Sequence, residues 1–188
     1  MATNKNAATI VDLFAHPPRQ IRIGGQVIIA LDGRSGSGKT QLARAVTALD
    51  SRIHIIAIEN FYHGWRGLRA GPPRLIREVL RPWAAGLPAR ARFWDWNIGA
   101  WSLRVTPQPL PAGGRVLIEG CGAGALELAP FTSGLVWLES AADVRFERAM
   151  SRDGEMFAPY WDTWAQQEVA LIGSDQAPQR ADLVLHSS

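Results

Sequence analysis

Near the N-terminus lies a run of residues whose types and spacing suit the binding of phosphate groups. The run Gly33-Arg34-Ser35-Gly36-Ser37-Gly38-Lys39-Thr40 fits the phosphate-binding loop pattern G-x-x-x-x-G-K-[ST] at every fixed position. Its glycines lack a Cβ atom, so they let the backbone turn tightly around an anion. Backbone N–H groups of this run, and of the helix expected to follow at Gln41, can then point at the phosphates. The sequence therefore predicts a nucleotide-binding loop at residues 33–41.

Two side chains in this loop indicate that the nucleotide is a triphosphate bound with Mg²⁺. Lys39 would reach the β- and γ-phosphates of ATP, and the Thr40 hydroxyl would be a ligand of Mg²⁺. Lys39 is one of two lysines in the chain, the other being Lys5, whereas arginine is abundant. The alternative is a glycine-rich turn that fits the pattern by chance. The flanking sequence opposes it, because an apolar run at 27–31 precedes the loop and helical spacing follows at 41–49.

The rest of the chain alternates strands and helices in the way that can carry such a loop. Short apolar runs predict strands at 27–31, 52–58, 115–119, 135–138 and 183–185. Helical spacing predicts helices at 7–15, 41–49, 75–85 (despite Pro82), 143–152 and 160–172. This alternation predicts an α/β fold of three layers with a mostly parallel, doubly wound five-stranded sheet. No repeat or internal boundary divides residues 1–188, so a single domain is expected.

Composition narrows the class of protein. The chain of 188 residues has a formal net charge of +3 and a sequence pI near 9.6, which permits contact with nucleic acid. Its apolar runs are far too short to span a membrane, and residues 1–8 lack the apolar centre of a signal peptide. Cys121 is the single cysteine, so an internal disulfide is excluded and a cytoplasmic location is expected. The sequence shows no Cys/His pattern with metal-ligand spacing.

Two carboxylates stand where predicted strands end. Glu59 comes directly after the strand at 52–58, and Glu119 is the last residue of the strand at 115–119. The carboxyl ends of parallel strands meet at one edge of a sheet, so both acids should lie beside the phosphate loop. Thr40 with Glu119 or Glu59 could hold the metal, and an acceptor hydroxyl would need a base. The alternative for each acid is an exposed strand end without a catalytic role.

Arginines supply the cations that phosphoryl transfer also requires. Arg145, Arg148 and Arg152 are three and four residues apart, so a helix at 143–152 would carry them on one face. Arg148 and Arg152 are followed by Gly154, which predicts a mobile lid at residues 150–160 that closes over the transferring phosphate. The alternative is a solvated helix whose arginines pair with neighbouring acids.

Residues 63–101 differ from the rest and would form an insert on the acceptor side. Between residues 66 and 92 the stretch carries seven arginines and one acid, and aromatic residues then surround Asp95. Tyr62 and Trp96 could offer flat faces to an acceptor, and Asp95 could accept hydrogen bonds from it. A ring with a negative charge would use the aromatics, Asp95 and the arginines together. The alternatives are a solvated basic face, tryptophans that only pack, and a nucleic-acid surface with stacked bases.

Taken in order, these segments resemble the uridine kinase/phosphoribulokinase family of P-loop kinases, above all its short uridine-kinase-like ATP-binding members from actinobacteria. The similar segments are residues 32–40, 59–62, 93–96, 116–120, 145–148 with 152–153, and 180–182. The resemblance implies a parallel sheet of five strands, Glu59 as the catalytic base and Glu119 as the acid of the metal site. It also implies that the lid residues Arg148 and Arg152 contact the transferring phosphate.

The chain departs from the family pattern at the acceptor pocket. The family has an aspartate where this chain has Glu59, which keeps a carboxylate but adds one methylene. Uridine kinases also carry an acceptor-binding aspartate, but the corresponding region of this chain reads Pro72-Pro73-Arg74-Leu75 and has no acid. They carry a histidine near the position of Asn97 as well, and this chain has none there.

The leading hypothesis is phosphoryl transfer from ATP·Mg²⁺ to a hydroxyl group of a small-molecule acceptor that is nucleoside-like or anionic. Its expected catalytic residues are Lys39, Glu59, Arg148 and Arg152. One alternative is a protein that binds ATP as a structural or regulatory ligand without transferring phosphate. A nucleic-acid-binding protein is the least favoured. The expected partners are therefore a nucleotide and an acceptor, with no membrane, and a homodimer is left open.

Overall fold

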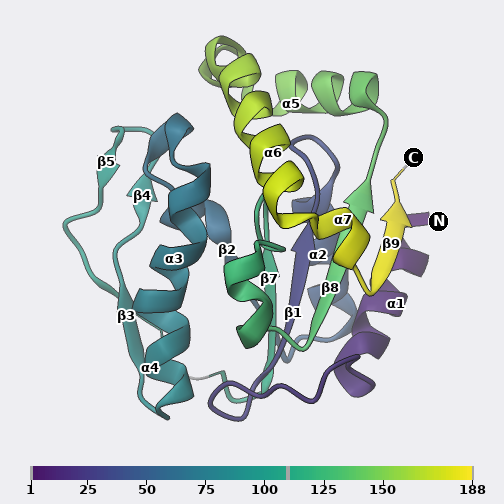
Figure 1. Cartoon of the computed structure of the whole chain (residues 1–188), viewed down its shortest axis with the longest axis vertical. Helices are drawn as coiled ribbons and strands as arrows, with labels where there is room; N and C mark the ends of the chain where they lie inside the picture. The colour runs from purple at the N-terminus through teal and green to yellow at the C-terminus, as the bar shows by residue number, and fades with distance from the viewer. Residues whose placement is uncertain (1, 109–110, 188) are drawn as a thin grey trace.

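The computed structural model describes residues 2–108 and 111–187. Its centre is a five-stranded sheet in the order β2-β7-β1-β8-β9, with every neighbouring pair of strands parallel (Figure 1). The strands are β1 (Val27–Asp32), β2 (Ile53–Ala57), β7 (Arg115–Glu119), β8 (Gly134–Glu139) and β9 (Leu183–His186). The predicted parallel sheet is confirmed, and its strands lie where the apolar runs indicated.

Strand β1 occupies the middle of the sheet, and its side chains alternate between two cores. Ile29 packs on one face of the sheet with α1 (Ala2–Ala15) and α2 (Lys39–Leu49). Ile28 packs on the opposite face in the core that includes residues of α6 (Trp161–Asp175). Helices therefore cover both faces, and the fold has the three layers that the sequence predicted.

The N-terminal helix α1 is longer than the apolar pattern indicated. Its buried residues, Ala7, Ile10 and Phe14, follow the helical spacing that predicted a helix at 7–15. The structure adds a first turn whose residues 3–5 are polar and exposed. Such a turn leaves no apolar pattern, so the sequence could not indicate it.

The insert at 63–101 is more regular than expected. Its main helix begins at Gly71 rather than near Leu75, and runs through α3 (Gly71–Leu75), a π-helical turn (Ile76–Leu80) and α4 (Arg81–Ala84). Prolines 72 and 73 fall in the first turn, where a missing N–H costs little, so they do not break the helix. The wider π turn directly precedes the turn that contains Pro82, as is common where a helix accommodates a disturbed hydrogen-bond ladder.

Two small antiparallel pairs complete this side of the molecule (Figure 1). They are β3 (Ala89–Ala91) with β6 (Thr106–Gln108), and β4 (Trp94–Asp95) with β5 (Ala100–Trp101). The β4–β5 hairpin carries the aromatic residues that the sequence placed near the acceptor.

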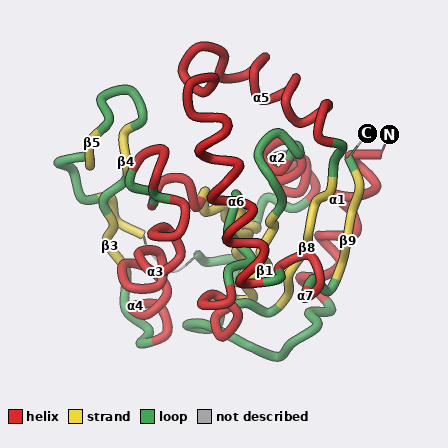
Figure 2. The backbone as a smooth tube through the Cα atoms, turned by 45° about the horizontal axis from the view of Figure 1, so that its top comes forward, coloured by secondary structure: helices red, strands yellow, loops and turns green. Residues whose placement is uncertain are grey.

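Helix α5 (Ala142–Phe157) extends past the predicted end at residue 152 and is bent at Gly154, which has φ 48° and ψ −126°. Only glycine adopts this backbone conformation readily, so Gly154 changes the direction of the chain there. α5 runs across the end of the molecule toward which β8 points, and α6 returns along the sheet (Figures 1 and 2). The segment proposed as a lid therefore joins these two helices.

The remaining short elements are α7 (Ala177–Arg180) and 3₁₀ turns at Ile58–Phe61, Gly64–Arg66, Leu68–Ala70, Leu126–Phe131 and Ala158–Tyr160. Among the described residues, no helix combines the length and the apolar character needed to cross a membrane.

Candidate functional site

The phosphate loop, residues 33–40, joins the carboxyl end of β1 to the start of α2. Gly36 and Gly38 have positive φ values of 79° and 93°, as the tight turn requires. A Cβ atom on Gly36 would collide with the backbone carbonyl of Arg145 in α5, so this position has no room for a side chain. The loop is therefore shaped by glycine and held closely against α5.

Lys39 is buried at the base of this loop, with 7% of its surface exposed. Its Nζ donates hydrogen bonds to the carbonyl oxygen of Arg34 at 2.9 Å and to Ser37 Oγ at 3.5 Å. Burial lowers the pKa of Lys39, but the surrounding negative charges, which include the carboxylates of Glu168, Asp32 and Glu119, outweigh it and raise the pKa overall. The loop therefore contains a buried ammonium group that can pair with phosphate oxygens.

Thr40 and Glu119 meet beside this ammonium group. The Thr40 hydroxyl donates a hydrogen bond to Glu119 Oε1 at 3.2 Å, from the first turn of α2 to the end of β7. Glu119 is 4% exposed, and burial raises its pKa while the charge of Lys39 opposes that rise. A buried carboxylate and a hydroxyl are oxygen ligands of the kind that Mg²⁺ prefers, and a bound cation would offset the cost of burying the carboxylate.

The hydroxyl of Thr40 and the carboxylate of Glu119 would suit a magnesium ion that binds together with a nucleotide. Within the described residues, no group of three or more His, Cys, Asp or Glu side chains could hold a metal by itself. Mg²⁺ in nucleotide sites commonly has one or two protein ligands and completes its shell with phosphate oxygens and water. Thr40 and Glu119 agree with that ligand set.

A cleft of about 570 Å³ opens in front of the phosphate loop. Of the residues that the sequence singled out, it brings together Ser35, Gly36, Gly38, Lys39, Thr40, Gln41, Glu59, Tyr62, Trp96, Glu119, Arg148 and Arg152. Among the described residues, Gly33, Arg34, Ser37 and Asp95 do not line it. Arg34, predicted as a nucleotide contact, instead directs its Nε to the carboxylate of Glu168 at 3.0 Å.

The predicted base and lid residues line the cleft from different elements. Glu59 lies in the 3₁₀ turn Ile58–Phe61 after β2, exposed and facing the cleft. Arg148 and Arg152 reach it from α5, and the ion pair of Arg152 with Asp153, at 2.6 Å, raises the pKa of Arg152. The cleft therefore holds an exposed carboxylate and two cations.

Arg145 does not join these two arginines, although all three share a helical spacing. It is 5% exposed and donates from its guanidinium to the backbone carbonyls of Ser140 at 3.2 Å and Ser35 at 3.3 Å. Arg145 therefore anchors the phosphate loop through the backbone carbonyl of Ser35. All three residues lie on α5, as the spacing predicted, but Arg145 is buried against the phosphate loop and does not line the cleft.

One wall of the cleft is aromatic, and we call Tyr62, Trp65, Trp96, Phe157 and Trp164 the acceptor wall. Tyr62 is 2% exposed and its hydroxyl donates to the carbonyl oxygen of Cys121. It can therefore offer its ring, but not a free hydroxyl, to a ligand. Trp65 lies 4.6 Å from Trp96 and stacks on Phe157 at 4.9 Å between ring centroids.

Asp95 lies outside the cleft and has a structural partner. Its carboxylate accepts the backbone N–H of Asn97 at 2.9 Å, in the turn between β4 and β5. The same oxygen is 3.4 Å from the N–H of Ile98. Of the two roles considered for Asp95, the structure favours the local turn over contact with an acceptor.

The seven arginines between residues 66 and 92 are all described, and in the described structure none of them lines the cleft. Arg69 pairs with Asp175 at 2.8 Å. Arg74 lies 2.9 Å from Glu78 and its guanidinium carbon stands 3.5 Å above the ring of Trp101. In the described structure this basic stretch therefore lies outside the cleft, and the contacts of Arg69 and Arg74 agree with the alternative in which its arginines pair and pack at the surface.

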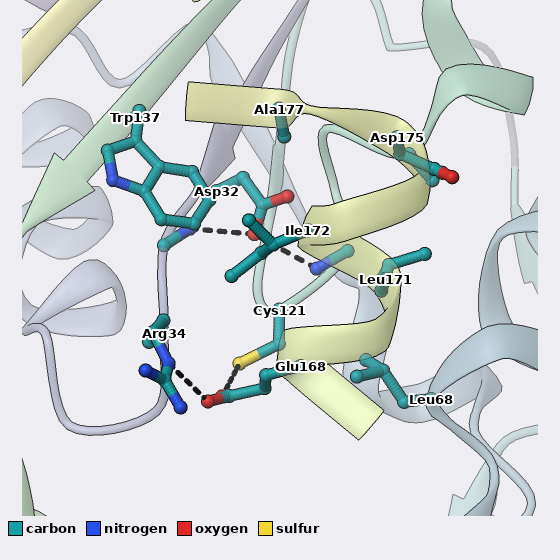
Figure 3. A pocket seen from close by; sticks show the side chains of 13 residues that line it. Asp32, Arg34, Leu68, Cys121, Trp137, Glu168, Leu171, Ile172, Asp175 and Ala177 are labelled. Atoms are coloured by element: carbon teal, nitrogen blue, oxygen red, sulfur yellow. Dashed lines mark hydrogen bonds and ion pairs between the residues drawn. The ribbon is translucent and has the colours of Figure 1, made fainter. Parts of the chain in front are cut away.

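Two buried acids that the sequence analysis did not single out hold the phosphate loop and its neighbours. Asp32 accepts the backbone N–H groups of Gly33, Gly122 and Gly124 at 2.6, 2.9 and 2.8 Å, and burial raises its pKa to about 6. Glu168 of α6 contacts the loop from the other side (Figure 3). A signal was available for Glu168, because an acid four residues after Trp164 and three before Leu171 lies on the apolar face of its helix.

No protein-family profile matches the chain, and no curated relative matches it. Similar folds occur among solved structures. A possible uridine kinase from Bacillus stearothermophilus has a TM-score of 0.68 and 19% identity, over 98% of this chain and 100% of that one. A candidate fructose transport system kinase from Silicibacter sp. TM1040 has a TM-score of 0.55 and 16% identity, over 98% of both chains. A D-glycerate 3-kinase from Cryptococcus neoformans var. grubii has a TM-score of 0.52 and 12% identity, over 94% of this chain and 85% of that one. The chain therefore has the α/β fold of these solved proteins over almost its whole length.

Proposed function

We propose that the protein transfers a phosphoryl group from ATP·Mg²⁺ to a hydroxyl group of a small molecule. The observation that carries the proposal is the content of one cleft. A phosphate loop with a buried ammonium group, a hydroxyl–carboxylate pair suited to Mg²⁺, an exposed carboxylate and two arginines all face it. Phosphoryl transfer needs these parts and little covalent chemistry from the protein. The solved proteins of similar fold that are named as kinases support the proposal.

Each residue has a role in this reaction. The phosphate loop and Lys39 would bind the nucleotide phosphates, and Thr40 and Glu119 would hold Mg²⁺, which supplies positive charge against the phosphate oxygens. Glu59 would take the proton of the acceptor hydroxyl while the hydroxyl oxygen bonds to the γ-phosphorus. ADP then leaves as the bond to the β–γ bridging oxygen breaks. Arg148 and Arg152 would stabilise the charge of the phosphoryl group in transit.

The acceptor wall indicates the class of acceptor. Its five side chains are aromatic, and the basic stretch 66–92 stays outside the cleft. Aromatic side chains bind planar rings through stacking and burial. The arginines that line the cleft, Arg44, Arg148 and Arg152, belong to α2 and α5 and not to this wall, and we assign them to the phosphates of the nucleotide. We therefore expect an uncharged acceptor with a planar ring and a hydroxyl group, which is the nucleoside-like member of the two classes that the sequence left open.

A paired screen tests the proposal. ADP release from Mg·ATP is measured with nucleosides and other planar alcohols, each beside its monophosphate, for the wild-type protein and for Lys39→Ala. We expect release that depends on an uncharged acceptor and disappears with Lys39→Ala. Nucleotide binding without release for every acceptor would favour the alternative of an ATP-binding protein without transfer. Preference for the phosphorylated member of each pair would contradict the expected acceptor class.

A further inference from the structure

Glu168 is a buried carboxylate that touches the phosphate loop from α6. It is 3% exposed. Its Oε1 accepts the backbone N–H of Ser35 at 2.7 Å, and its Oε2 accepts Nε of Arg34 at 3.0 Å (Figure 3 shows the contact with Arg34). Both partners belong to the phosphate loop. A single side chain of α6 therefore holds the backbone and a side chain of this loop.

The same carboxylate also touches the acceptor wall. Trp164, one helical turn earlier on α6, donates its indole N–H to Glu168 Oε1 at 3.1 Å. Trp164 lines the cleft, and its ring lies 5.2 Å from that of Tyr62 and 6.1 Å from that of Trp65. Oε1 of Glu168 therefore accepts one N–H from the phosphate loop and one from the acceptor wall.

The position is an unusual one for an acid. Glu168 faces the apolar core with Trp164 and Leu171, and burying a carboxylate there is costly unless it is paired and fully hydrogen-bonded. Arg34 supplies the opposite charge, and the N–H groups of Ser35 and Trp164 supply further donors. The thiol of Cys121 also donates to Oε1 of Glu168, at 3.3 Å. An apolar residue would pack at this position without that cost, so the contacts of Glu168 call for a role beyond packing.

We propose that Glu168 is a positioning residue that couples the phosphate loop to the acceptor wall. The inference rests on the proposed function, because it assumes that nucleotide binds the loop and acceptor binds the wall. Nucleotide on the loop orders Ser35, and through Oε1 it orders the indole of Trp164. An acceptor bound against Trp164 would likewise order Oε1 of Glu168, and through it the backbone N–H of Ser35 in the phosphate loop. Each ligand therefore strengthens the binding of the other.

Three variants test this coupling. Glu168→Met keeps a side chain of similar length but removes both carboxylate oxygens, and with them the acceptor shared by the N–H groups of Ser35 and Trp164. Trp164→Phe keeps an aromatic ring but removes the indole donor. Asp162→Asn is the matched control, since Asp162 is an exposed acid near the start of the same helix. Circular dichroism first establishes that each variant is folded.

Two measurements are made with Mg·AMP-PNP as the probe. Calorimetry gives its Kd, which we expect to rise about tenfold in Glu168→Met and about threefold in Trp164→Phe. Nuclear magnetic resonance follows the indole N–H of Trp164, identified as the signal that Trp164→Phe lacks. We expect Mg·AMP-PNP to shift this signal in the wild-type protein and in Asp162→Asn, but not in Glu168→Met at saturation. A purely structural Glu168 would change the stability of the fold without breaking this link.

The outcomes separate the two proposals. A Kd in Glu168→Met within twofold of the wild-type value, or a Trp164 signal that still shifts in that variant, would overturn the coupling. If Glu168→Met fails to fold, Trp164→Phe decides, and an unchanged Kd there overturns it. Failure of the wild-type protein to bind Mg·AMP-PNP would instead contradict the proposed function.

Discussion

The hydroxyl of Thr40 and the carboxylate of Glu119 are joined by a hydrogen bond of 3.2 Å, although 79 residues separate them in the chain. Parallel pairing of β1 with β7 brings them together, because Leu31 lies in register with Glu119 and the phosphate loop begins two residues later. The bond links the loop that would bind phosphates to the acid that would bind the metal. It also holds both oxygens within reach of one ion.

This relationship predicts how magnesium dependence changes when the carboxylate is removed. Glu119→Gln keeps the size of the side chain and an oxygen for Thr40, but loses the negative charge that attracts Mg²⁺. We expect the Mg²⁺ concentration for half-maximal nucleotide binding to rise about tenfold. Titration of Mg²⁺ at fixed ATP measures it. Glu147→Gln, an exposed acid on α5, is the control. An unchanged Mg²⁺ requirement in Glu119→Gln would exclude Glu119 from the metal site.

The two lysines of the chain form a natural pair for testing the phosphate loop. Lys39 lies buried in the loop, whereas Lys5 is exposed on α1. We expect Lys39→Ala to weaken ATP binding roughly a hundredfold, because a charge-assisted contact with the phosphates is lost. Lys5→Ala should bind as the wild-type protein does. Calorimetry measures both, and equal affinity of the two variants would remove the central claim about the loop.

Asp32 predicts a pH dependence of stability. Burial raises its pKa from 3.8 to about 6, so between about pH 4 and pH 6 the folded protein binds more protons at this group than the unfolded chain does. The free energy of unfolding therefore falls through this window as the pH rises. Asp32→Asn removes the titration, so the free energy of unfolding of the wild-type protein minus that of the variant should fall from pH 4 to pH 7. Urea unfolding at several pH values measures it, and a difference that stays constant would show that the pKa of Asp32 is not raised.

The sheet and the phosphate loop could be predicted because their signals are local. An apolar run such as Val27–Asp32, followed by a glycine motif and helical spacing, indicates strand, loop and helix without knowledge of the rest of the chain. The meeting of Thr40 and Glu119 could also be predicted, since the strand ends of a parallel sheet share one edge.

The parts that could not be predicted depend on contacts between distant segments. Arg69 appeared as one of many arginines, but its partner Asp175 lies 106 residues away. The role of Glu168 depends on α6 returning beside the phosphate loop, 133 residues after Ser35. Asp95 lies between two tryptophans in the sequence, which suggested an acceptor site. Its carboxylate instead accepts the backbone N–H of Asn97, two residues later, within a turn. Composition and spacing carry no information on such pairings.

Arg152 should act on the rate more than on nucleotide affinity. It reaches the cleft from α5 just before the bend at Gly154, and a contact with the phosphoryl group would strengthen in the transition state. We expect Arg152→Ala to lower kcat about a hundredfold while changing the Kd of ATP less than threefold. Arg77→Ala, an arginine outside the cleft, is the control. Equal losses in kcat and in ATP affinity would indicate ground-state binding instead.

Two of the three tryptophans in the β4–β5 hairpin, Trp94 and Trp96, should differ in their effect on the acceptor. Trp96 lines the cleft, whereas Trp94 packs away from it against His63 and Trp101, with ring centroids 4.9 and 5.2 Å apart. We expect Trp96→Ala to raise the KM of an acceptor found by the screen about tenfold, because a stacking surface is lost. The KM of ATP should stay within twofold, since Trp96 lies on the wall and not in the loop. Trp94→Ala controls for damage to the hairpin and should leave both KM values unchanged. Steady-state kinetics with each substrate varied in turn decides between them, and equal effects of the two variants on the acceptor would show that the aromatic wall does not bind it.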